Sequence, residues 1–94
     1  MTQTTNTKVT TYAPGWDIEN LWKVVIKEVN DNNKTNLKIR LGNCNEDIAK
    51  LSKNIDELAQ GTKEDIACIR AYANTVEEIT KIREYIRYSL TKIN

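Results

Sequence analysis

The stretch that decides the fold is IAKLSKNIDELAQGTKEDIACIRAYANTVEEITKIREYIRYSLTKI, residues 48–93. With Ile48 as heptad position a, eleven of the fourteen a and d positions up to Ile93 are apolar or aromatic, and the phase never slips. A seven-residue repeat sustained over this length indicates helices that pack as in a coiled coil. The sequence therefore predicts an all-α protein.

The residues beside this seam are small and neutral. Of the twelve e and g positions between Ser52 and Ser89, only Arg87 is charged. Two-stranded coiled coils usually carry Glu and Lys there. The charges lie instead at positions b, c and f, which predicts that each helix contacts neighbours on two sides, as in a bundle of four or more helices. We expect an elongated helical hairpin or coiled-coil bundle that assembles as an oligomer.

The repeat passes through a candidate turn. Gly61 is a favourable residue just after a helix end, and Thr62 followed by Asp65 forms a capping pair for a new helix. These residues favour a hairpin, whereas the unbroken heptad favours a single rod of about 70 Å. In a parallel rod, Asp65 and Arg83 would each face their own copies, which is costly without pairing. The hairpin is our prediction. Arg83 is expected to reach solvent, and a polar layer that sets the register or a recognition point for a partner is the alternative. The two helices of the hairpin are expected over residues 46–60 and 63–92.

An earlier helix is marked by its N-terminal residues. Asp17 is a good N-cap, and it places Trp16 and Leu21 at the two positions of a hydrophobic staple. The apolar residues that follow recur at helical spacing up to a run of Asn and Asp. The sequence predicts a helix over residues 18–30, in which Trp16 has a structural role.

The segment between these helices is ambiguous. Residues 37–41, LKIRL, alternate as in a strand, yet their first and last leucines are also four apart and share the heptad register with Cys44. We leave strand and helix open here. Gly42 and then Asn45, a candidate cap, place the start of the next helix near residue 46.

Residues 1–15 are rich in Thr and end in Ala-Pro-Gly. They lack the apolar side chains that would offset the entropy of ordering. We expect a flexible arm over residues 1–15 and a single helical oligomerisation domain over residues 16–94.

Composition excludes several function classes. The 94 residues contain no His and no glycine-rich phosphate loop, so we expect no enzyme, no cofactor and no metal site. A net charge of +1 lacks the basic excess of a typical nucleic-acid-binding protein. The two Cys show no metal or redox spacing, and the longest apolar run has four residues. We expect a cytoplasmic or otherwise intracellular protein without a membrane span.

These observations favour a protein-protein interaction role. We expect a self-associating scaffold or adaptor, a homo-oligomer from dimer to tetramer, with a further protein partner whose identity the sequence does not give. The alternative is a small inhibitor or regulator that binds one macromolecule through its arm, first helix and tyrosine-bearing face. A weaker alternative is oligomeric nucleic-acid binding through the basic residues between Lys34 and Arg40. The expected oligomer interface comprises Ile48, Leu51, Ile55, Leu58, Ile66, Ile69, Tyr72, Val76, Ile79, Ile82, Ile86 and Leu90. The candidate partner-binding residues are Tyr12, Trp16, Trp22, Tyr85 and Tyr88.

Overall fold

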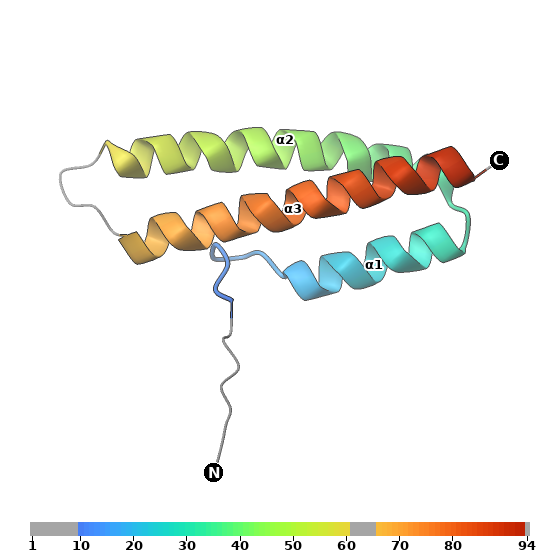
Figure 1. Ribbon diagram of the computed structural model, residues 1–94, viewed down its shortest axis with the longest axis horizontal. Helices are drawn as coiled ribbons and strands as arrows, with labels where there is room; N and C mark the ends of the chain where they lie inside the picture. Colours follow the sequence, from blue (N-terminus) through green and yellow to red (C-terminus); the bar gives the residue numbers. More distant parts are fainter. Residues whose placement is uncertain (1–9, 61–65, 94) are drawn as a thin grey trace, which may run out of the picture.

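The computed structural model describes residues 10–60 and 66–93. Within these ranges the chain is all-α and contains no strand, as predicted. Its three helices are α1 (Ile18–Asn30), α2 (Lys34–Ala59) and α3 (Ile66–Lys92) (Figure 1).

Helix α1 has the predicted bounds and the predicted cap. The side chain of Asp17 accepts a hydrogen bond from the backbone N–H of Asn20 at 3.0 Å. This bond satisfies one of the four amide groups that the first turn of a helix leaves without a partner. At the other end, Asn32 takes a left-handed backbone conformation with φ of 56°, which turns the chain toward α2.

Helix α2 begins twelve residues earlier than predicted. Its N-cap is Asn33, whose side chain accepts from the backbone N–H of Asn36 at 3.2 Å, and residues 37–41 are helical rather than extended. The prediction was wrong because it read Gly42 as a breaker and Asn45 as a cap. A glycine inside a helix costs only about 1 kcal/mol. Buried Leu37, Cys44 and Leu51 recur every seven residues along α2, and their packing offsets that cost.

The chain folds back after α2, so the hairpin is confirmed and the single rod is not. Helix α2 ends at Ala59 with Gln60 as its C-cap, and α3 returns antiparallel along its length (Figure 1). Helix α3 is described from Ile66, not from residue 63 as predicted. The proposed turn residues Gly61, Thr62 and Asp65 lie outside the described residues.

Helix α1 is half as long as its neighbours. Its 13 residues span about 20 Å, whereas the 26 and 27 residues of α2 and α3 span about 40 Å. It lies beside the C-terminal half of α3 and contacts the N-terminal half of α2 (Figure 1). One half of the hairpin is therefore covered by a third helix, and the other half is not.

The core lies where the three helices meet. Helix α3 buries residues mainly at heptad positions d and g rather than at a and d. The fully buried side chains are Val25, Leu37, Leu51, Thr75, Ile79, Ile82 and Ile86.

The chain before α1 is packed where we expected a flexible arm. The backbone N–H of Ala13 donates to Thr75 Oγ1 at 2.7 Å, and Asn74 Nδ2 donates to the backbone carbonyl of Thr11 at 3.1 Å. Ala13 is 3% exposed. Residues 10–15 therefore lie against α3, held by two hydrogen bonds that composition does not reveal. The remainder of the predicted arm, residues 1–9, lies outside the described residues.

Candidate interaction surface

The α2–α3 hairpin has one edge that faces α1 and one that does not. Helix α1 contacts positions c and g, such as Arg40 on α2 and Tyr85 on α3. By helical periodicity, positions a and e lie on the opposite side of both helices. We call this second side the open edge. Its apolar a positions are half-buried, and Arg83 interrupts the apolar series. The apolar a positions are Leu41, Ile48, Ile55, Ile69, Val76 and Leu90.

The open edge is flanked by small side chains. Its e positions include Ser52 and Ala59 on α2 and Ala73 and Thr80 on α3. The guanidinium of Arg83 has partners within the chain: it donates to Asn45 Oδ1 at 3.2 Å and pairs with Glu84 at 3.1 Å. Lys38, Asn45 and Arg87 also occupy e positions, so the open edge presents only apolar or small residues mainly in the half of the hairpin that α1 does not cover.

Among the described residues, no third helix covers the end of the hairpin beyond α1, and only Thr10 and Thr11 lie near Ile66 there. We call the five apolar side chains of this end the hairpin tip: Ile55, Leu58, Ile66, Ile69 and Tyr72. Four are half-buried, and Ile66 is 66% exposed. Leu58 and Tyr72 also line a shallow cavity of about 310 Å³ with Asn54 and Glu57. All five tip residues belong to the predicted oligomer interface.

Four residues of that predicted interface instead hold the single chain together. Leu51, Ile79, Ile82 and Ile86 are buried between the helices of one copy. They have no accessible surface to offer a second copy in this structure. The accessible part of the predicted set comprises the hairpin tip together with Ile48, Val76 and Leu90.

The candidate partner-binding aromatic residues also divide into those that pack within the chain and those that are exposed. The rings of Trp22 and Tyr85 lie 5.7 Å apart at an angle of 53°, and Trp22 Nε1 donates to Glu78 Oε1 at 3.0 Å. These two residues therefore join α1 to α3. Tyr12 is half-buried against the core, whereas Tyr88 is 61% exposed with Lys92 Nζ 5.2 Å from its ring centre.

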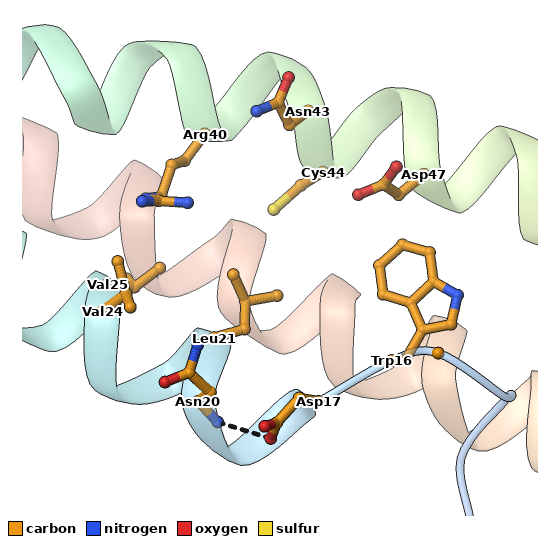
Figure 2. A pocket seen from close by; sticks show the side chains of 11 residues that line it. Trp16, Asp17, Asn20, Leu21, Val24, Val25, Arg40, Asn43, Cys44 and Asp47 are labelled. Atoms are coloured by element: carbon orange, nitrogen blue, oxygen red, sulfur yellow. Dashed lines mark hydrogen bonds between the residues drawn. The ribbon is translucent and has the colours of Figure 1, made fainter.

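A cleft between α1 and α2 was not predicted from the sequence. It has a volume of about 340 Å³ (Figure 2). Figure 2 shows Arg40 at one end and Trp16 with Asp47 at the other, with Leu21 and Cys44 between them. The sequence did not reveal this cleft because Arg40 and Cys44 precede residue 46, where the second helix was predicted to start.

The Arg40 end of the cleft is closed by a charge pair. The Arg40 guanidinium donates through Nε to Glu28 Oε1 and through Nη2 to Glu28 Oε2 at 3.0 Å. Asn36 Nδ2 adds a weaker bond to the same carboxylate at 3.4 Å. The hydrogen bond from Arg40 to Glu28 raises the pKa of the arginine further. Glu28 is buried, so this two-point pair satisfies a carboxylate that would otherwise be costly to bury.

The Asp47 end of the cleft is electrostatically different. Partial burial raises the pKa of Asp47, and Lys50 only partly opposes this effect. The neighbouring Cys44 is a buried free thiol. Burial raises the pKa of that thiol, and the charge of Asp47 raises it further. Cys44 is therefore a neutral wall of the cleft rather than a reactive thiolate.

Two further features bear on chemical function. Among residues 10–60 and 66–93, no group of three or more His, Cys, Asp or Glu side chains is placed to hold a metal ion. In the same part of the chain, no helix combines the length and apolarity that crossing a bilayer requires.

No protein-family model matches the chain, and neither the curated proteins nor the solved structures include a significant match.

Proposed function

We propose that this chain is a non-enzymatic helical protein that self-associates and serves as a scaffold or adaptor for a protein partner. The observation that carries the proposal is the half-length of α1. Beyond it the α2–α3 hairpin is only two helices thick, and the apolar hairpin tip remains partly exposed. In a pair of helices, each helix buries little more than the one stripe of side chains that faces the other helix. A second hairpin would complete a four-helix bundle at this end.

The energetic scale of the tip limits the affinity that the tip alone can supply. Covering one half-exposed Ile, Leu or Tyr side chain contributes about 1 kcal/mol. Two tips of five such residues then contribute about 10 kcal/mol, which is comparable with the cost of association. Burial of the open edge adds to this gain. The tips alone therefore only offset the cost of association, and a micromolar dissociation constant requires about 8 kcal/mol more from the rest of the open edge. We expect an assembly between dimer and tetramer.

The open edge also suits close packing against another copy. Small residues at its e positions, such as Ala59 and Ala73, allow a second helix pair to approach without large side chains in the way. The interface would be self-complementary, because a two-fold dimer uses the same surface on both partners.

Two exposed isoleucines give a matched test. Ile66 lies in the hairpin tip and is 66% exposed, whereas Ile39 lies on the outer face of α2 and is 58% exposed. Ile66→Asp should reduce the solution mass toward the 10.8 kDa of one chain, and Ile39→Asp should leave the wild-type mass unchanged. Light scattering coupled to size-exclusion chromatography measures the mass, and circular dichroism checks that both variants keep their helices.

A wild-type protein that is monomeric at high micromolar concentration would contradict self-association. An Ile66→Asp variant with unchanged oligomeric mass would instead leave self-association in place and remove the tip from the interface.

The alternative of a regulator with an aromatic binding face has less support. Two of its five candidate residues, Trp22 and Tyr85, contact each other within the chain, and Tyr88 is its most exposed member. The nucleic-acid alternative is also weakened, because Arg40 is paired with Glu28. Loss of partner binding in Tyr88→Ala, with an unchanged solution mass, would favour the regulator over the scaffold.

A further inference from the structure

The cleft between α1 and α2 has one carboxylate whose charge is left uncompensated. Among residues 10–60 and 66–93, no Lys or Arg nitrogen lies within ion-pair distance of Asp47. Lys50, three residues further along α2, acts on Asp47 without contacting it. The other charged groups of the cleft have partners: Arg40 pairs with Glu28, and Asp17 accepts the capping bond from Asn20. The Asp47 end is therefore the part of the cleft that would attract a cation.

The walls of the cleft fit an aliphatic stem that carries a planar cation. Leu21 and Val24 form an apolar side, and the neutral Cys44 thiol lies opposite them (Figure 2). At the far end, the Trp16 indole lies below the Asp47 carboxylate in the same view. An indole face attracts a cation, and a guanidinium can stack on it while it donates two hydrogen bonds to a carboxylate.

Size sets a limit on the ligand. A volume of about 340 Å³ lies at the small end of the range for ligand sites, which is about 300–1,000 Å³. The cleft is therefore suited to one long side chain rather than to a nucleotide or a large cofactor.

We propose that the cleft between α1 and α2 binds an arginine side chain of a partner polypeptide, with its guanidinium held between the Asp47 carboxylate and the Trp16 indole. The methylene stem packs against Leu21 and Val24. This interaction is independent of self-association, since neither the hairpin tip nor the open edge contributes to the cleft.

The test uses a small probe and the two tryptophans as internal reporters. N-acetyl-arginine amide is titrated into the protein, and the side-chain N–H resonances of Trp16 and Trp22 are followed by NMR. We expect a saturable shift of Trp16 with a dissociation constant in the millimolar range, as befits a single side chain. Trp22 should stay unshifted, because it does not line the cleft and its N–H points to Glu78 on α3.

Two variants and a neutral probe measure how much the ion pair between the arginine probe and Asp47 contributes to binding. Asp47→Asn should weaken binding about tenfold through loss of the ion pair. Asp56→Asn removes the same charge from an exposed position of α2 and should leave binding unchanged. N-acetyl-norleucine amide, which has an apolar side chain without the cation, should not reach saturation.

Three outcomes would overturn the proposal. These are a Trp16 resonance that does not shift at high probe concentration, an Asp47→Asn variant that binds as tightly as Asp56→Asn, and a neutral probe that binds as well as the arginine probe. The last result would show an apolar cleft without preference for a cation.

Discussion

The two halves of the α2–α3 hairpin carry the same heptad repeat but differ in what covers them. In the covered half, α1 packs against positions c and g, and the side chains of Ile79, Ile82 and Ile86 are fully buried. At the tip, equally apolar residues such as Ile69 remain half-exposed. The repeat therefore indicates which residues face a neighbouring helix, but it does not say whether that helix belongs to the same chain.

The largest expected difference between the halves is the cost of removing a core side chain. Ile79→Ala should lower the free energy of unfolding by about 3–4 kcal/mol, because it leaves a cavity among buried neighbours. Ile69→Ala, the same change at the tip, should cost only about 1 kcal/mol in dilute protein. Urea unfolding at low concentration measures both. Equal losses at the two sites would break the comparison.

The charge pair of the covered half should have the next largest effect. Arg40→Ala leaves buried Glu28 without its two-point partner, which should cost about 2 kcal/mol. Adding Glu28→Gln to Arg40→Ala should recover part of this loss, because an uncharged amide is cheaper to bury. If the double variant is less stable than Arg40→Ala alone, the cost does not arise from the unpaired carboxylate.

The chain segment that precedes α1 crosses toward the uncovered half, and Thr75 anchors it. Thr75→Val keeps the shape of the side chain but removes the acceptor of the Ala13 N–H, which should cost about 1–2 kcal/mol. Thr75→Ser retains the hydroxyl and serves as the control. Hydrogen exchange of the Ala13 amide should accelerate in the valine variant and not in the serine variant. Equal exchange in both variants would show that this bond does not hold the segment.

The smallest predicted effect has the opposite sign. Gly42 lies inside α2 on an exposed face, and a Cβ atom built there meets nothing within 4 Å. Gly42→Ala should therefore raise the free energy of unfolding by about 0.5–1 kcal/mol. Gly15→Ala is the contrasting variant, because Gly15 has a φ of +87° that favours glycine. Destabilisation by Gly42→Ala would contradict a continuous helix across this residue.

Local signals predicted those parts of the fold that depend on local chemistry. Asp17 and the spacing of Trp16 and Leu21 were enough to place α1 with its observed bounds. The predicted start of α2 was wrong because Gly42 and Asn45 resemble residues at helix ends. Leu37 and Cys44 share one heptad register, which is consistent with the single helix observed.

The candidate surfaces were harder to predict, because they depend on which helix covers which face. Glu78 and Tyr85 occupy c positions, which are solvated in a simple coiled coil. Here Trp22 of α1 contacts both, so residues predicted to bind a partner instead join two helices. The cleft beside Asp47 depends on the same unpredicted position of α1.

Hydrogen exchange at two protein concentrations tests the central claim most directly, because it compares both halves in one experiment. We predict that amides of the tip, in residues 52–59 and 66–74, become more protected as the concentration rises from low to high micromolar. Amides of α1, which lies on the side of the hairpin opposite the open edge, should exchange at rates that do not change. Tip protection that is independent of concentration across this range would contradict self-association through the uncovered half of the hairpin.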